Sequence, residues 1–222
     1  MAGKWRGIAL ATSGVSPTIQ PEWVGPPDNV IPGALPLELH LAASKTAVVA
    51  LRGRAAYPTG FEFDLVARLR AQTLQEEPST SQFLVVSPEE ITEGKLPPRF
   101  LRFGLEFSDG RKVTNLPRAK SRLITDPGVG PVLWGRDGSG SNSAWRQAYW
   151  VWPLPPPGPL KFVCAWPAFG IPESAASVDA AVVIDAANRA TVVWPLEEFG
   201  SHRARGGSSW SGLQPHLGDS AP

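Results

Sequence analysis

The sequence predicts an all-β protein, an immunoglobulin-like antiparallel β-sandwich with one short helix near the C-terminus. Three observations favour this fold. Several short segments alternate apolar and polar residues with the period of two that half-buried strands show. Glycine-, proline- and aspartate-containing turn signals separate those segments. The stretch from Trp145 to Pro167 carries four of the nine tryptophans and a Pro-Pro-Pro-Gly turn, a composition that a helix does not tolerate.

The strand patterns lie in the middle of the chain. Residues 1–33 contain five prolines without periodicity and predict an irregular N-terminal arm. The β-sandwich domain is expected at residues 34–199. Residues 200–222 are rich in glycine and serine, which predicts a disordered tail.

Two pairs of strands are expected within this domain. LPLELHL (residues 35–41) alternates leucine with other residues, and TAVVALRG (residues 46–53) follows closely enough to be its hairpin partner or neighbour. RFLRFGLEF (residues 99–107) alternates in the same way and leads into Ser-Asp-Gly, a hairpin signal. RKVTNL (residues 111–116) is then the returning strand.

The clearest alternation is TGFEFDLVARLR (residues 59–70). Its apolar residues face one way, and its charged residues are expected on the opposite, solvated face. One dry face per strand predicts a core made of thirteen residues: Leu37, Leu39, Leu41, Val49, Phe61, Phe63, Leu65, Leu101, Phe103, Leu105, Phe107, Phe162 and Cys164. The charged face comprises Glu62, Asp64, Arg68 and Arg70.

Two later segments complete the predicted secondary structure. GRDGSGSNS (residues 135–143) has few side chains to bury and is expected to be a flexible loop. Apolar residues at helical spacing predict one helix over residues 179–190, preceded by a short extended run.

Charge, cysteine content and hydropathy exclude several classes of function. The chain has 222 residues, and 21 Lys and Arg balance 20 Asp and Glu, so no nucleic acid partner is expected. Cys164 is the only cysteine, which excludes an internal disulfide and a zinc site made of several thiolates. No apolar run reaches membrane-spanning length, so we expect a cytoplasmic protein without a membrane partner.

No catalytic, cofactor-binding or metal-binding signature is found. The three histidines lack metal-ligand spacing, and the apolar neighbours of Cys164 favour a buried, unreactive thiol. Three tryptophans of the aromatic stretch leave two readings open: burial in the fold, which tryptophan usually prefers, or an exposed stacking surface for a ligand. These residues are Trp150, Trp152 and Trp166.

Three runs carry a resemblance to a known family. RAAYPTGFEFDLVARLR, LRFGLEFSDGRKVTNL and YWVWPLPPPGPLKFVCAWPAFGIPES resemble a family of uncharacterised bacterial proteins with WPLPPPGPL and SDGR hairpin motifs. The resemblance covers roughly residues 35–195. It implies a compact β-sandwich and no particular activity, cofactor or catalytic residue.

The sequence therefore predicts a non-enzymatic interaction or scaffold protein with an unknown protein partner. Its partner surface is expected on a sheet face or at the loops Tyr57–Gly60 and Pro155–Gly158, because sandwich loops gather at the domain ends. The alternative is a small-molecule or carbohydrate-binding module that uses the three tryptophans. A hydrolase is the third hypothesis, and it has no residues to support it.

Overall fold

Antiparallel β-strands make up most of the described chain, which confirms the prediction of an all-β protein. The computed structural model describes residues 21–70, 95–116, 130–141 and 143–194, together with the single residues 83, 86 and 90. The first twenty residues of the predicted arm and the predicted tail lie outside these described residues.

The larger sheet has six strands in the order β2-β4-β5-β9-β8, with β3 pairing beside β2 on the same edge of β4. The predicted hairpin of residues 35–53 is confirmed, because β3 and β4 pair antiparallel. Strand β8 occupies the segment predicted as a flexible loop, so that prediction is wrong. The bounds are β2 Gly33–Ala34, β3 Glu38–Ala43, β4 Ala47–Ala56, β5 Phe61–Leu69, β8 Val132–Gly140 and β9 Ala144–Trp152.

The smaller sheet has four strands in the order β11-β10-β6-β7. The Ser-Asp-Gly turn joins β6 to β7 as predicted, with Gly110 at a φ of 84° that favours glycine. Strand β11 is nine residues long, where only a short extended run was expected, because it pairs along most of β10. The bounds are β6 Arg102–Glu106, β7 Lys112–Thr114, β10 Pro159–Trp166 and β11 Ile171–Asp179, with the 3-10 turn η4 Pro167–Phe169 between the last two.

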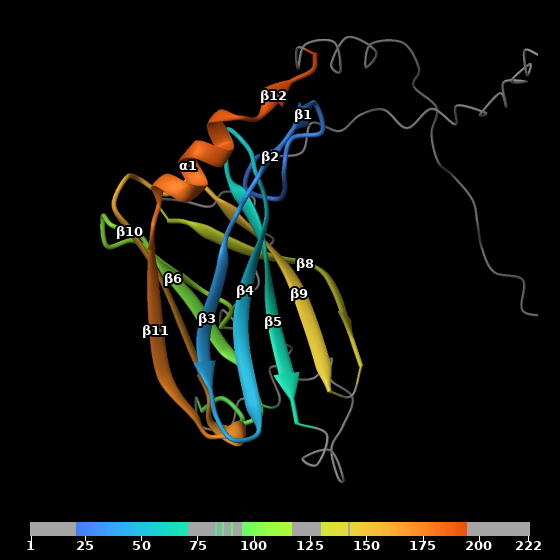
Figure 1. The fold of residues 1–222 in the computed structure, drawn as a ribbon, viewed down its shortest axis with the longest axis vertical. Coiled ribbons are helices and arrows are strands. Elements are labelled where there is room, and N and C mark those ends of the chain that lie inside the picture. The colour runs from blue at the N-terminus through green and yellow to red at the C-terminus, as the bar shows by residue number, and fades with distance from the viewer. Residues whose placement is uncertain are drawn as a thin grey trace, which may run out of the picture. The chain divides into compact units, whose positions relative to one another are not determined.

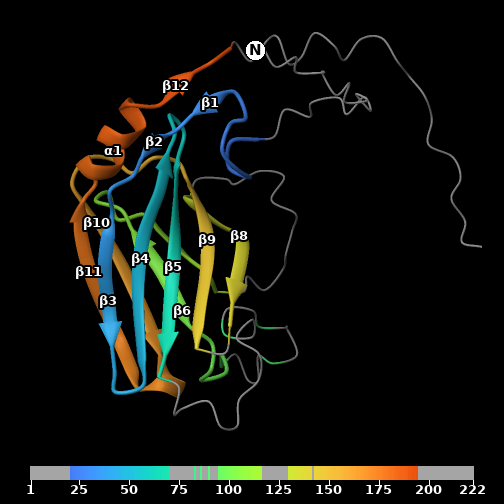
Figure 2. The ribbon, with the colours of Figure 1, turned by 45° about the vertical axis from the view of Figure 1, so that its right-hand side comes forward.

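The two sheets form two layers (Figures 1 and 2). Their facing sides share one apolar core, in which the Phe63 ring of β5 lies 5.7 Å from the Phe103 ring of β6 and 5.8 Å from the Phe162 ring of β10. Twelve of the thirteen predicted core residues are buried, and Leu39 on edge strand β3 is half-buried against the core. Period-two alternation therefore predicts the inner faces correctly.

The predicted helix is confirmed as α1 (Ala181–Asn188), which packs on β2 and β4. Asp179 Oδ1 accepts a hydrogen bond of 2.9 Å from the Ala181 amide at its start. Gly33 has no room for a Cβ atom because the Ala186 carbonyl lies against it, so glycine permits this close packing. Next to the helix, β1 (Val30–Ile31) pairs with β12 (Thr191–Val192), so regular structure begins before residue 34.

Beyond β7, one side chain completes the backbone pairing of β6. The Asn115 amide donates to the Phe103 carbonyl at 2.9 Å. Its side-chain Oδ1 accepts from the Phe103 amide at 2.8 Å, and its Nδ2 donates to the Leu101 carbonyl at 2.9 Å. Asn115 thus satisfies the edge of β6 where β7 has ended.

Candidate functional site

The three tryptophans of the ligand-binding alternative do not form one exposed surface in the structure. Trp150 on β9 and Trp166 on β10 belong to different sheets, and both are fully buried. Trp166 Nε1 donates to the Arg99 carbonyl at 2.8 Å, and its ring packs on Phe83 and Phe169. Trp152 is half-exposed.

Trp150 lies on the outer face of the larger sheet and is covered there by two segments. Its Nε1 donates to the Glu22 carbonyl at 2.9 Å, and its ring meets Tyr57 edge to face at 5.6 Å. Trp152 meets Trp23 in a similar way at 6.2 Å. The Tyr57–Gly60 turn, one of the two loops expected to bind a partner, therefore packs on the sheet.

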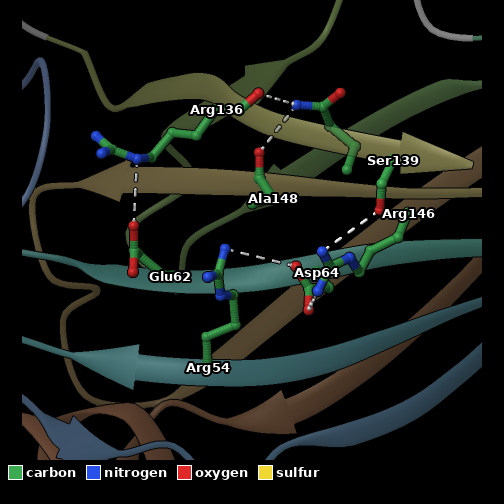
Figure 3. Close-up of polar contacts among 8 residues, drawn as sticks. Arg54, Glu62, Asp64, Arg136, Ser139, Arg146 and Ala148 are labelled. Atoms are coloured by element: carbon green, nitrogen blue, oxygen red, sulfur yellow. Dashed lines mark hydrogen bonds and ion pairs between the residues drawn. The ribbon is translucent and has the colours of Figure 1, made fainter. Parts of the chain in front are cut away.

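A cluster of charged side chains occupies the same outer face and is the most site-like feature of the described chain (Figure 3). It joins two carboxylates of β5 to one arginine from each of β4, β8 and β9. We call it the arginine cluster. Its members are Arg54, Glu62, Asp64, Arg136 and Arg146.

Strand geometry brings these residues together. Glu62 and Asp64 stand two residues apart, so both leave β5 on the face opposite the phenylalanines. Arg54 lies at a register shift in β4 between Gly53 and Ala55, and Arg136 lies at a shift in β8 between Gly135 and Gly138. Such bulges redirect side chains, and here both arginines reach a carboxylate of β5.

Each carboxylate is held by ion pairs rather than by short hydrogen bonds. Arg136 Nε lies 3.4 Å from Glu62 Oε1. Asp64 has two cations, with Arg54 Nη1 3.8 Å from its Oδ1 and Arg146 Nη1 3.7 Å from its Oδ2. Ser139 Oγ accepts from Arg146 Nη2 at 3.4 Å, and the Gln147 side chain donates to the Arg136 carbonyl at 2.6 Å.

The carboxylates lie below the guanidinium groups. The side chains of Glu62 and Asp64 are each 11% exposed, whereas the three arginine side chains are 34% to 49% exposed. Glu62 and Asp64 were expected on a solvated face, and that expectation is wrong, because the arginines cover them. Arg52 and Arg68 of the same face are also exposed. The charge that meets solvent is therefore mainly that of guanidinium.

Burial also shifts the acid-base behaviour of this face. Desolvation raises the pKa of Glu62 above its ordinary value, although Arg54 and Arg136 act to lower it. Desolvation likewise raises the pKa of Tyr57, and the nearby Glu62 charge adds to that rise. Both groups are therefore harder to ionise than in water.

The arrangement is suited to binding an anion. Both carboxylates already lie within 4 Å of arginine, while most guanidinium N–H donors of the cluster have no acceptor among the described residues, and the three arginines are exposed. Guanidinium forms paired hydrogen bonds with carboxylate or phosphate groups. Among the described residues, no group of three His, Cys, Asp or Glu side chains is placed to hold a metal ion.

Sequence reasoning misses this cluster for a definite reason. Arg136 lies in the glycine- and serine-rich segment read as a loop, and its neighbours give no alternation because glycines fill the strand. The signal that was available is the charge pattern of β5, where two acidic residues alternate with phenylalanine. Acidic residues on a sheet face are stabilised by cationic residues on the neighbouring strands. The sequence, however, does not show which strands are neighbours.

We compared the chain with known families, curated proteins and solved structures. No family model, curated protein or solved structure matches the chain. The resemblance to a bacterial family with WPLPPPGPL and SDGR motifs therefore stays a prediction. Within the described residues, no helix has the length and apolar character needed to cross a membrane.

Proposed function

We propose that the protein is a non-enzymatic interaction or scaffold protein that binds an acidic segment of a cytoplasmic partner protein through the arginine cluster. We further propose that its fold is an immunoglobulin-like β-sandwich. The two antiparallel sheets with a shared core support that fold. Sandwiches serve many functions, so the argument for binding rests on the cluster alone.

One observation carries the proposal: the cluster exposes its arginines and buries its carboxylates. The buried carboxylates position the guanidinium groups and reduce the freedom that binding would otherwise have to remove. Arginine is also enriched among the residues that contribute most to protein interfaces. An acidic peptide supplies the carboxylates that the outward N–H donors lack.

The test uses a synthetic oligoglutamate peptide and isothermal titration calorimetry. Arg146→Gln removes one outward guanidinium and leaves Asp64 paired with Arg54, so each carboxylate of β5 keeps a contacting cation. We expect the peptide to bind roughly tenfold more weakly to this variant, the loss of one charge-assisted contact. Binding should also weaken as salt concentration rises.

Arg111→Gln is the matched control. Arg111 has a side-chain exposure of 37%, against 49% for Arg146, and pairs with Asp109 at 2.7 Å in the hairpin of the smaller sheet. Its replacement should leave peptide binding unchanged. Equal losses in both variants, or no binding to the wild-type protein, would overturn the proposal.

A second candidate is a carbohydrate-binding module, and Trp134 favours it. This residue of β8 is 38% exposed, and it lies opposite Trp150 in the register of the larger sheet. An exposed indole beside arginines and carboxylates can stack on a sugar ring and hydrogen-bond its hydroxyls. A shift of tryptophan fluorescence on titration with soluble glycans, lost in Trp134→Ala, would favour this candidate over the peptide-binding one.

A further inference from the structure

Arg102 on the smaller sheet differs from the other partly buried arginines of the described chain. Three arginines of that chain are partly buried. Arg99 pairs with Glu90, and Arg111 pairs with Asp109. Arg102 has neither an ion pair nor a side-chain hydrogen bond with any described residue, and its Nε is buried without a hydrogen-bond partner among them. Because a desolvated cation is unfavourable without an acceptor, binding of an anion to this guanidinium would be favourable.

Arg102 has space beside it for a ligand. Arg102 lines two adjoining surface hollows, of about 570 Å³ and 210 Å³, on the outer face of the smaller sheet. Both hollows also share Ala165 and Glu173. Volumes of this order accommodate small organic ligands.

The strand register explains why this part of the sheet is hollow. Arg102 of β6 lies directly opposite Ala165 of β10, and Glu173 lies on the far side of β10 at the register shift of β11. The small side chain of Ala165 therefore separates a cation from an anion that are not ion-paired with each other. Gly104 lines the smaller hollow without a side chain. A Cβ atom at this position would meet the Val113 carbonyl and the Thr114 side chain at 2.9 to 3.0 Å.

The rest of the lining is mostly apolar. Val163 and Leu116 border the smaller hollow, and Pro167, Ile171 and Pro172 border the larger one. A ligand that fits must place a negative group at Arg102 and apolar atoms over this surface.

We propose that these hollows bind a small monocarboxylic acid with an aliphatic or aromatic body. The carboxylate accepts hydrogen bonds from the outer nitrogens of the Arg102 guanidinium, and the apolar body covers Ala165 and Val163. Glu173 disfavours ligands with two negative charges, because its carboxylate would repel the second charge. The site therefore favours a monocarboxylate over inorganic phosphate. It lies on the opposite sheet from the arginine cluster and does not depend on the function proposed for that cluster.

Nuclear magnetic resonance tests the proposal on the full chain with hexanoate and inorganic phosphate as probes. We expect hexanoate to shift the Arg102 Nε–H signal and the backbone amide signals of Gly104 and Ala165 in a saturable way. Arg102→Gln should weaken binding by roughly tenfold or more, as expected for the loss of a paired charge-assisted contact. Phosphate should shift these signals weakly in the wild-type protein and more strongly in Glu173→Gln.

Two further variants separate binding from folding. Lys112→Gln removes a cation that pairs with Glu106 on the same face of the smaller sheet, and it should leave hexanoate binding unchanged. Ala165→Leu fills the floor and should abolish binding while the rest of the amide spectrum stays native. The proposal is overturned if phosphate shifts the wild-type signals as strongly as hexanoate does. It is equally overturned if hexanoate binds Arg102→Gln or Ala165→Leu with unchanged affinity.

Discussion

The two faces of strand β5 are both buried, but by different means. Phe61 and Phe63 on the inner face have no exposed surface and pack among other apolar rings. Glu62 and Asp64 on the outer face are 8% exposed and lie under arginines. The same nine residues thus form a dry core on one side and an ion-pair layer on the other.

This difference bears on how each face contributes to stability. Removing apolar surface from water is favourable without any particular partner. Burying a carboxylate is unfavourable unless a cation compensates for the lost hydration. The inner face should therefore respond to changes of volume, and the outer face to changes of partner and of pH.

The largest effect is expected on the inner face. Phe63 contacts four aromatic rings from both sheets, so Phe63→Ala should leave a cavity and lower the free energy of unfolding by about 3–5 kcal/mol. Urea denaturation followed by fluorescence measures this loss. A loss below about 1 kcal/mol would mean that the two sheets do not share a tightly packed core.

A smaller effect is expected where the partner of a buried carboxylate is removed. Among the described residues, Glu62 has one ion pair, and Asp64 has two. Arg136→Gln should therefore lower the free energy of unfolding by about 1–2 kcal/mol, because it leaves Glu62 without its contacting cation. Arg146→Gln should cost less than about 1 kcal/mol, because Arg54 still pairs with Asp64. Equal losses in the two variants would show that the number of partners does not matter here.

The pH dependence of Glu62 should be smaller still, and its sign is defined. Because burial raises its pKa above 4.5 in the folded state, the protonated form is favoured there. Its stabilising contribution is present at low pH and is lost as the pH rises through the raised pKa. Glu62→Gln keeps this position neutral, so its stability relative to wild type should increase from pH 4 to pH 7. Urea denaturation at both pH values tests this, and a relative decrease would show that arginine pairing outweighs desolvation.

The reactivity of Cys164 tests whether solvent reaches the inner face, and this test needs no mutation. The side chain is 1% exposed, and burial raises the pKa of its thiol to about 11. The native protein should therefore resist iodoacetamide at pH 8, and urea-unfolded protein should react at once. Mass spectrometry of the intact chain gives the extent of alkylation. Rapid reaction of the native protein would show that solvent reaches the core.

Sequence patterns predict the inner faces better than the outer ones. Alternation identifies Phe61, Phe63 and Leu65 as core, because apolar burial depends on each residue's own side chain. Burial of Glu62 depends instead on Arg136, which lies more than seventy residues away in a strand made largely of glycine and serine. The pairing of β8 and its register shift produce no local sequence pattern from which they could be predicted.

The same distinction applies to the tryptophans and to Arg102. Burial is the usual fate of tryptophan, and Trp150 and Trp166 follow it. However, the sequence does not reveal that a segment near Glu22 covers Trp150. Nor does it distinguish Arg102 from other arginines, because its lack of a partner follows from the small residue opposite it in the register.

The position of Asn115 has a consequence for how copies of this protein behave at high concentration. A strand edge with free amide and carbonyl groups can recruit a strand from another chain and start fibre growth. The carboxamide of Asn115 already occupies the groups of Leu101 and Phe103 where β7 ends. An incoming strand would have to displace that side chain before it could pair. Among the described residues, this one side chain therefore blocks strand addition at the part of β6 that β7 does not cover.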